Sequence, residues 1–213
     1  MSLFPIIAPV EAAVVAVAYN SEAAGNGSDA SSFTFSSQTL GAGKIVVLVG
    51  GANESASLSS VTVDGNTASL LADISPSGSK RLSVLQYNGN TSSSGDVVVT
   101  YSGTQGRCGI GVYLVTGAAD SATDNLEATA TSAPSIALDC PANGVIIAAA
   151  LTENNNSVSW SGVTEDFEVS TEATENRLIG ASDAFAAEQV NLTIQATAST
   201  NEVNLIGISW GLA

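Results

Sequence analysis

The side chains of this sequence that could do chemistry are mostly carboxylates. The densest acidic group lies in the second half of the chain and comprises Glu165, Asp166, Glu168, Glu172 and Glu175. Two carboxylates can serve as acid and as base or nucleophile in glycoside hydrolysis without help from histidine. Such hydrolases also line their sugar cleft with several aromatic side chains, and this sequence has only two tryptophans. An acidic group in so acidic a chain is more simply a solvated surface, so we expect no enzymatic activity.

The sequence lacks the residues that most other catalytic and metal-binding sites require. The sequence contains no histidine, which excludes Ser-His-Asp and Cys-His catalysis, histidine bases and histidine-ligated metals. The two cysteines, Cys108 and Cys140, cannot build a four-cysteine zinc site, and we expect them to be free, partly buried thiols. No glycine-rich phosphate loop precedes a helix. We therefore expect no catalytic residue and no cofactor.

Oxygen-rich stretches and tryptophans are the remaining candidates for a site. Calcium ligands could come from Asp120, Asp124, Asn125 and Glu127, or from the run 154–156, but neither stretch has the ligand spacing of a calcium loop. We therefore expect no metal site. Trp160 and Trp210 occupy strand positions that match places in the other half of the chain, which favours a core or half-buried role over a sugar-binding platform.

The N-terminal segment has an unusual composition for the end of an acidic chain. Residues 3–9 are Leu-Phe-Pro-Ile-Ile-Ala-Pro. They could form a first strand or a flap over the domain's own core, or an arm that docks on a neighbouring subunit, and the prolines favour lying on a surface over joining a sheet. The candidate docking residues are Leu3, Phe4, Pro5, Ile6 and Ile7. The segment has no basic region and is interrupted by prolines and Glu11, so we expect neither a signal peptide nor a membrane span.

Charge restricts the partners. Five basic residues stand against twenty acidic ones, which gives a net charge of −15. Nucleic-acid binding requires Lys and Arg to neutralise phosphates, and an anionic membrane would repel this chain. We expect no nucleic acid and no membrane among its partners, which leaves a highly soluble surface protein or one whose partner is neutral or basic.

The hydrophobic pattern predicts an all-β fold. Short apolar runs recur about every 10 to 15 residues, and many alternate with polar residues, as in 61–63, 82–84 and 192–194. Turn sequences rich in Gly, Asn, Asp and Pro separate them, and no window has a sustained helical period. The pattern is typical of an antiparallel β-sandwich.

An internal repeat divides the chain into two similar halves, about 13–117 and 118–213. Five segments match in the same order: 40–49 with 140–149, 60–65 with 157–162, 81–82 with 177–178, 97–101 with 190–194, and 111–117 with 206–211. Either each half forms its own small sandwich, or the halves interleave into a larger one. We favour a single sandwich domain over 13–213, with halves related by a pseudo-twofold rotation and residues 1–12 as an N-terminal arm.

Several of these segments, read together, resemble a known family. They are Ser-Phe-Thr-Phe, Leu-Gly-Ala-Gly-Lys-Ile-Val-Val-Leu-Val, Ser-Val-Thr-Val-Asp-Gly, Arg-Leu-Ser-Val-Leu-Gln-Tyr and the closing Ile-Ser-Trp-Gly. The pattern, from about Val14 to Gly211, is similar to the jelly-roll virion proteins of tailed bacteriophages, which are capsid decoration (cement) proteins or minor tail and fibre proteins. The resemblance implies a jelly-roll fold, no catalytic residues, and an acidic, oligomeric component of the virion that is made in the host cytoplasm.

The leading functional hypothesis is a capsid decoration protein. It would lie on the outer shell and stabilise the capsid by bridging major capsid subunits, with the major capsid protein or other virion proteins and further copies of itself as partners. A minor tail or fibre component is the first alternative. A carbohydrate-binding module is the second, because a jelly roll is an ordinary scaffold for one.

Overall fold

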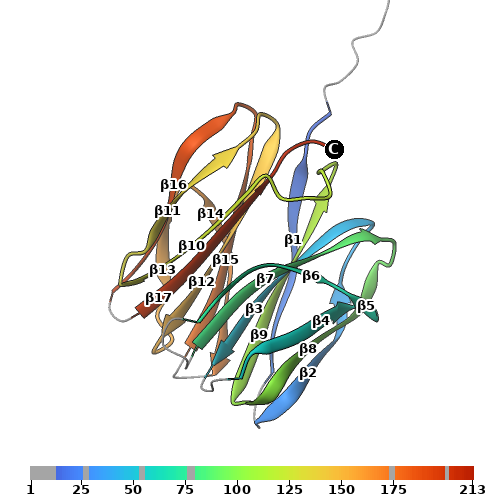
Figure 1. The fold of residues 1–213 in the computed structure, drawn as a ribbon, viewed down its shortest axis with the longest axis vertical. Coiled ribbons are helices and arrows are strands. Elements are labelled where there is room, and N and C mark those ends of the chain that lie inside the picture. The colour runs from blue at the N-terminus through green and yellow to red at the C-terminus, as the bar shows by residue number, and fades with distance from the viewer. Residues whose placement is uncertain (1–12, 26–28, 53–55, 76–79, 173–175, 200–201) are drawn as a thin grey trace, which may run out of the picture.

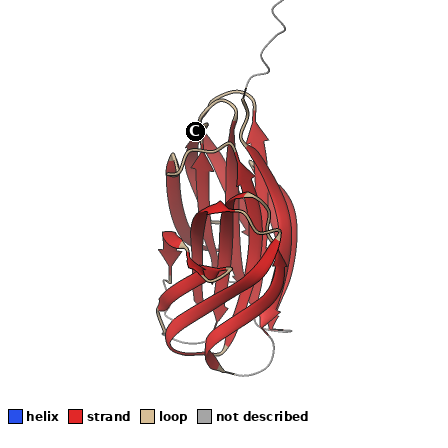
Figure 2. Ribbon diagram, turned by 90° about the vertical axis from the view of Figure 1, so that its right-hand side faces the viewer, coloured by secondary structure: helices blue, strands red, loops and turns tan. Residues whose placement is uncertain are grey.

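The computed structural model describes residues 13–25, 29–52, 56–75, 80–172, 176–199 and 202–213. The strands of the first half are β1 (Ala16–Gly25), β2 (Ala30–Thr39), β3 (Gly43–Ala52), β4 (Leu58–Val63), β5 (Asn66–Thr67), β6 (Ser69–Ile74), β7 (Lys80–Asn90), β8 (Ser94–Gln105) and β9 (Arg107–Thr116). Those of the second half are β10 (Asp124–Thr131), β11 (Ser135–Cys140), β12 (Gly144–Glu153), β13 (Val158–Ser161), β14 (Thr164–Glu172), β15 (Asn176–Phe185), β16 (Gln189–Ala198) and β17 (Glu202–Trp210). The described chain contains no helix, so the all-β prediction is confirmed (Figure 2).

Each half builds its own pair of antiparallel sheets. The first half forms the orders β1-β9-β3-β7-β6 and β2-β8-β4-β5, and the second half forms β10-β17-β12-β15-β14 and β11-β16-β13. Every described ladder joins strands of the same half, so the strands do not interleave between halves as we favoured from the sequence. The sandwich architecture is confirmed, but it is built twice (Figure 1).

The inner strands explain why two sandwiches form and why they stay together. In β12 nine consecutive residues, Gly144–Thr152, are buried, and in β3 residues 46–51 are buried likewise. A strand that is apolar on both faces needs cover on both sides. Its own smaller sheet covers one face, and the five-stranded sheet of the other half covers the second face. Outer strands such as β11 alternate buried and exposed residues, because only one of their faces is covered.

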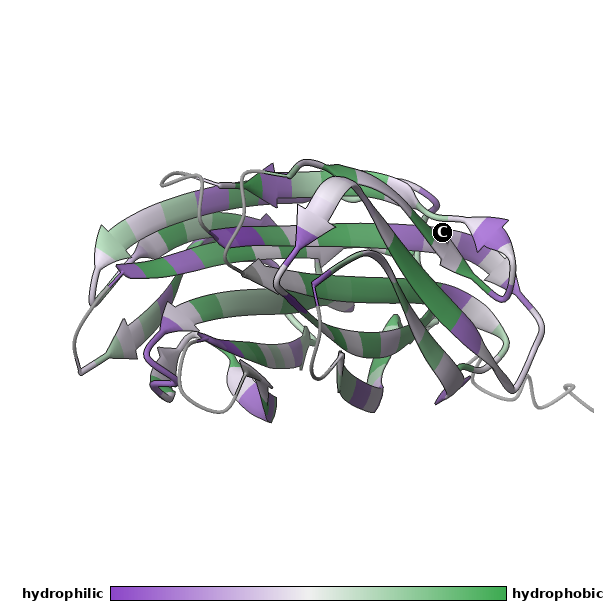
Figure 3. Cartoon of the chain, turned by 90° about the horizontal axis from the view of Figure 1, so that it is seen from below, coloured by the Kyte–Doolittle hydropathy of each residue, from purple (hydrophilic) through white to green (hydrophobic). Residues whose placement is uncertain are grey.

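The described residues form three hydrophobic cores. One lies between the two sheets of the first half and includes Phe35, Val47 and Ile110. The corresponding core of the second half includes Leu138 and Ile194. The third, which we call the inter-half core, lies between the two five-stranded sheets, and both halves contribute to it: Val46, Leu48, Val84, Tyr113, Ile147, Leu151, Phe167, Ile206, Ile208 and Trp210 are among its members. Hydrophobic residues accordingly concentrate along the strands, and the ends of the sheets are more hydrophilic (Figure 3).

Contacts across the inter-half core are reciprocal. Strand β14 packs against β1 and β9, and its equivalent β6 packs against β10 and β17. Strand β7 contacts β12 and β17, and its equivalent β15 contacts β3 and β9. Reciprocity of this kind is what a twofold axis imposes on an interface, so the two halves meet as the subunits of a symmetric dimer would. The grouping of 13–213 as one domain stays a prediction.

Candidate partner-docking site

The predicted docking residues Leu3, Phe4, Pro5, Ile6 and Ile7 lie outside the described residues. The structure does describe the place where this segment joins the body. There β1 begins at one end of the molecule, next to the C-terminus (Figure 1).

An apolar groove of about 400 Å³ lies beside the beginning of β1. It runs between the two halves and is lined by Val14, Val15, Ala16, Val17, Asn143, Gly144, Ala184, Phe185 and Ala186. The side chain of Val14 is 58% exposed, although it is a large hydrophobic residue. None of the lining residues is charged, in a chain of net charge −15. The groove therefore offers an uncharged apolar surface to a partner.

The turn before β12 fixes the floor of this groove. The backbone N–H of Val15 donates to the carbonyl of Asn143 at 3.0 Å, which ties the start of the first half to the second half. Asn143 has a φ of 58°, in the left-handed region that Asn tolerates better than most residues. The N–H of Gly144 closes the turn on the carbonyl of Pro141 at 3.0 Å. Asn143 and Gly144 form the Asn-Gly dipeptide that is typical of a tight turn, whereas no local pattern distinguishes Phe185.

At the equivalent place in the first half, polar side chains bind the segment that links the two halves. Register pairs Val46 with Gln86 in the first half and Ile147 with Ser182 in the second, so Lys44 corresponds to Val145 and Asn88 to Ala184. There the segment that links the halves is held by its carbonyls. The oxygen of Asp120 accepts bonds from Lys44 Nζ at 3.2 Å, Gln86 Nε2 at 2.7 Å and Asn88 Nδ2 at 3.3 Å.

Lys44 makes the most contacts among the polar side chains that bind the linking segment. It is 5% exposed, it also donates to the carbonyl of Ala119, and its Nζ lies 5.4 Å from the ring centroid of Trp210. Burial lowers the pKa of Lys44 to about 8, and the nearby Asp120 carboxylate opposes that shift. Trp210 in turn donates its indole N–H to Gln86 at 3.2 Å. The only sequence signal for Lys44 was a charged residue at the start of a long apolar run.

The acidic group proposed for glycoside hydrolysis is distributed along strand β14. Glu165 is exposed, Glu172 lies at the end of the strand, and Glu175 is outside the described residues. Asp166 is half-buried and accepts hydrogen bonds from Tyr113 Oη at 3.0 Å and Ser182 Oγ at 2.7 Å. Burial raises the pKa of Asp166 above its ordinary value, partly offset by these two bonds. The pKa of Glu165 is raised by burial and by the neighbouring Glu168 carboxylate.

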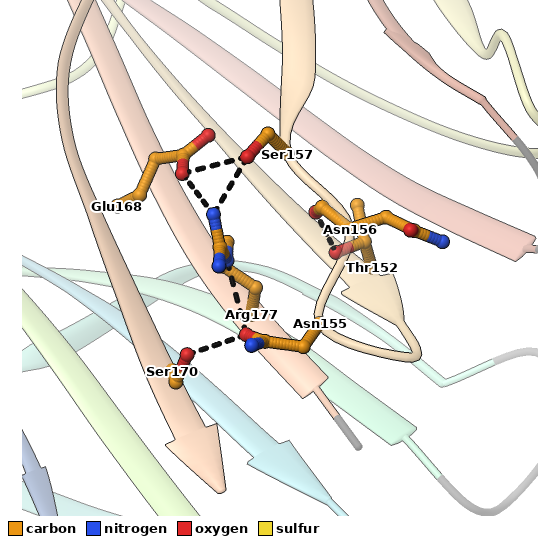
Figure 4. A network of polar contacts seen from close by, with 7 residues as sticks. All are labelled: Thr152, Asn155, Asn156, Ser157, Glu168, Ser170 and Arg177. Atoms are coloured by element: carbon orange, nitrogen blue, oxygen red, sulfur yellow. Dashed lines mark hydrogen bonds and ion pairs between the residues drawn. The ribbon is translucent and has the colours of Figure 1, made fainter. Parts of the chain in front are cut away.

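The other described carboxylate of this group, Glu168, belongs to a bonded network (Figure 4). It forms an ion pair with Arg177 and accepts a bond from Ser157 Oγ at 2.9 Å. Arg177 also donates through Nε to Asn155 Oδ1 at 3.0 Å. The first half has the equivalent pair, Arg81 with Asp73. Because matching positions of both halves carry this pair, it fastens an edge strand to its neighbour in each sheet.

Two of the side chains considered as calcium ligands form hydrogen bonds within the protein. Asp124 Oδ2 accepts the backbone N–H of Asp139 at 3.1 Å, and Asn125 Nδ2 donates to the carbonyl of Leu71 at 3.1 Å. Across the residues that the structure describes, no three Cys, Asp or Glu side chains gather in an arrangement that could hold a metal ion.

The tryptophans and cysteines lie where the sequence placed them. Trp210 is fully buried in the inter-half core, and Trp160 is half-buried against the core of the second half. Cys108 and Cys140 are both free and buried. Burial raises the pKa of the Cys108 thiol to about 12 and that of Cys140 to about 11, which makes both poor nucleophiles.

A second buried lysine joins the halves at the other end of the molecule. Lys80 is 3% exposed, and its Nζ lies 2.6 Å from Glu153 and 3.2 Å from Glu202. Lys80 belongs to the first half and both acids belong to the second. No local sequence pattern marks this ion pair, because the two acids lie 73 and 122 residues away from Lys80 along the chain.

No protein family, curated protein or solved structure matches this chain. None of the described segments forms a helix long and apolar enough to span a membrane.

Proposed function

We propose that this chain is a structural virion protein, a capsid decoration protein that lies on the outer shell and bridges major capsid subunits. The observation that carries the proposal is the uncharged groove beside β1. It lies where an apolar N-terminal segment joins an acidic body, so the attachment surface and the anchoring segment share one end of the molecule.

The nested strand pairing supports the jelly-roll part of the proposal. In the first half β1 pairs with β9, β2 with β8, β3 with β7 and β4 with β5. In the second half β10 pairs with β17, β11 with β16 and β12 with β15. A chain that folds back on itself in this order produces two Greek keys, which is the arrangement of a jelly roll. We propose that the protein is a tandem of two such units.

The aromatic residues favour a structural role over a carbohydrate-binding module. Sugar-binding platforms need exposed rings. Among the described residues every aromatic side chain is buried or half-buried, including Trp160 and Trp210.

The N-terminal arm supplies the anchoring energy in this proposal. Burying Leu3, Phe4, Ile6 and Ile7 on a partner would contribute several kcal/mol before ordering costs, at about 25 cal/mol per Å². Pro5 and Pro9 reduce the backbone entropy that docking removes. The acidic body would meanwhile oppose non-specific association.

Deletion of residues 2–9 tests the proposal. The truncated protein should stay folded and soluble, with a nearly unchanged melting temperature, and should no longer sediment with DNA-filled heads. Full-length protein with Val190→Ser is the matched control, because Val190 is 66% exposed and lies on β16, outside the groove. Normal incorporation of the truncated protein would contradict the anchoring role, and recovery of the full-length protein with detached tails would favour a tail component.

A further inference from the structure

We propose that the apolar groove beside β1 binds the N-terminal segment of a second copy of this chain. The inference rests on the arm of the proposed function and specifies its partner: the arm and the groove join two copies, and the shared end of that dimer, rather than a single chain, would then lie on the shell. It assigns residues 3–7 as the occupant and the surface formed by Val14–Val17, Asn143–Gly144 and Ala184–Ala186 as the receptor.

Composition matches the two surfaces to each other. The nine lining residues carry no charge, and neither does any residue from Met1 to Val10. Acidic residues outnumber basic ones by twenty to five, so most charged segments of this chain would bring a carboxylate to the groove. An acidic partner segment would have to give up the hydration of its carboxylates in this groove. A volume of about 400 Å³ suits a few apolar side chains, since ligand pockets span roughly 300 to 1,000 Å³.

Geometry favours a second copy over the chain's own segment. Val14 and Ala16 themselves line the groove, so the same chain would have to reverse direction within residues 8–13 to enter it. Those residues are Ala-Pro-Val-Glu-Ala-Ala, in which Pro9 is the one residue that tight turns favour, and it has no N–H to close a turn. The segment should therefore leave its own body and enter the groove of a neighbour.

The comparison with the equivalent place in the first half supports a receptor role. There Lys44, Gln86 and Asn88 hold the linking segment by its carbonyls. In the second half the residues corresponding to Lys44 and Asn88 are Val145, which is fully buried, and Ala184, which lines the groove. The groove thus lacks two of the polar groups that bind a polar segment, and Ala184, with its neighbour Phe185, presents an apolar wall that suits an apolar one.

Reciprocal exchange would give a closed assembly. Because each groove adjoins the root of its own arm, two copies that exchange arms bring the same ends together around a twofold axis. The interface is then self-complementary, with each copy acting once as donor and once as receptor.

Cysteine cross-linking tests the contact directly. We would place Ile7→Cys and Ala184→Cys in one full-length chain, oxidise it mildly and separate it on a non-reducing gel. Cys108 and Cys140 are buried and should not react. A disulfide-linked dimer is expected. A monomer with an internal disulfide would overturn the second copy as partner, and the absence of any bridge would overturn the groove as the receptor.

Charge exchange provides the second measurement, by sedimentation of full-length protein. Ala184→Glu and Ile7→Lys, each alone, should weaken self-association at least about tenfold, the scale of a buried hot-spot contact. An equimolar mixture of the two variants should restore association, because the lysine arm of one copy meets the glutamate groove of the other. Val190→Glu is the control, since it adds the same charge at an exposed position outside the groove.

These outcomes separate the inference from the proposed function. A wild-type chain that stays monomeric at high concentration, or an Ala184→Glu variant that associates normally, would overturn the inference. The proposed function would still stand if deletion of residues 2–9 abolished incorporation into heads. Conversely, an arm-exchanged dimer that never sediments with particles would support the inference and contradict the virion role.

Discussion

The inter-half core has two edges that the repeat makes equivalent but that are filled in opposite ways. At the first seam β1 packs against β14, and at the second seam β10 packs against β6. Both β14 and β6 carry a β-bulge at the same place relative to the strand they pair with, between Glu165 and Phe167 and between Leu70 and Ala72. The two edge strands therefore share this bulge, although β1 carries a further bulge between Tyr19 and Ser21 that β10 lacks.

The first seam is filled by aromatic rings. Phe167 stacks on Tyr19 with centroids 5.2 Å apart, and Tyr113 lies 6.2 Å from Phe167. Two glycines make room for Phe167, because a Cβ on either Gly111 or Gly180 would overlap its ring.

The second seam reverses this distribution of large and small residues. Register places Ala72 at the position of Phe167, Val84 at that of Gly180 and Ile206 at that of Gly111. Asn125 stands where Tyr19 does. A groove of about 420 Å³ remains, lined by Leu71, Ala72, Asp73, Asn125, Leu126 and Glu127.

This difference shows that the duplicated halves keep the strand order of the five-stranded sheet and the bulge of its edge strand while they redistribute side-chain volume. At the first seam one large ring enters from the edge strand. At the second, Val84 and Ile206, one from each of the two facing sheets, occupy the positions of the two glycines. Equivalent strands can therefore surround the same buried core with large side chains that come from different strands.

Removing the ring should have the largest effect. Phe167→Ala should lower the free energy of unfolding by about 3–5 kcal/mol, because Phe167 is buried and the two glycines cannot fill the cavity. Leu71→Ala in the second seam is the matched variant, and it should cost about 1 kcal/mol, since Leu71 is only partly buried beside an open groove. Urea titration of both would measure the difference. Equal losses would show that the seams contribute alike.

Filling the space beside the ring should have the next largest effect. Gly111→Ala should destabilise the protein by about 1–3 kcal/mol through overpacking against Phe167. In the Phe167→Ala background the same methyl group enters a cavity and should be neutral or stabilising. A double-mutant cycle in urea would therefore give a coupling of at least about 1 kcal/mol. Additive losses would refute the steric explanation.

The acid at the first seam should make stability depend on pH. The pKa of Asp166 is raised above its ordinary 3.8 in the folded protein, so the folded state holds this proton more tightly than the unfolded state. Its contribution is complete below pH 3.8 and is lost as the pH rises through the folded pKa. Asp166→Asn removes this titration. The stability of the wild type relative to the variant should therefore fall as the pH is raised from 3 to 7, and a difference that is constant or rises would contradict the assignment.

The smallest effect should come from the second seam. Asn125→Ala removes the bond to the carbonyl of Leu71, and because this bond is exposed to solvent it should cost about 0.5 kcal/mol or less. Tyr19→Ala at the equivalent position should cost several times more, since its ring stacks on Phe167. Thermal unfolding of the pair would rank them, and the reverse order would contradict the description of the seams.

Local pattern determined much of this fold. Alternating runs and turn residues marked the strands, and all five matched segments fall on equivalent strands: β3 and β12, β4 and β13, β7 and β15, β8 and β16, β9 and β17. The burial of Trp210 and the free thiols Cys108 and Cys140 followed from the same reading. These properties depend on neighbours in sequence or on side-chain type, so one chain suffices to predict them.

Only the tertiary structure decided how the halves combine. The apolar runs 45–49 and 145–151 required cover on both faces, but the requirement is satisfied equally by interleaved strands or by two stacked sandwiches. The sequence likewise did not predict the groove beside β1 or the ion pairs of Lys80 with Glu153 and Glu202. Nor did it predict that Ala72 would stand at the position equivalent to Phe167. Each depends on residues that are distant in sequence and meet only once the sheets have paired, and hydrophobicity, being non-directional, does not specify which partner a strand selects.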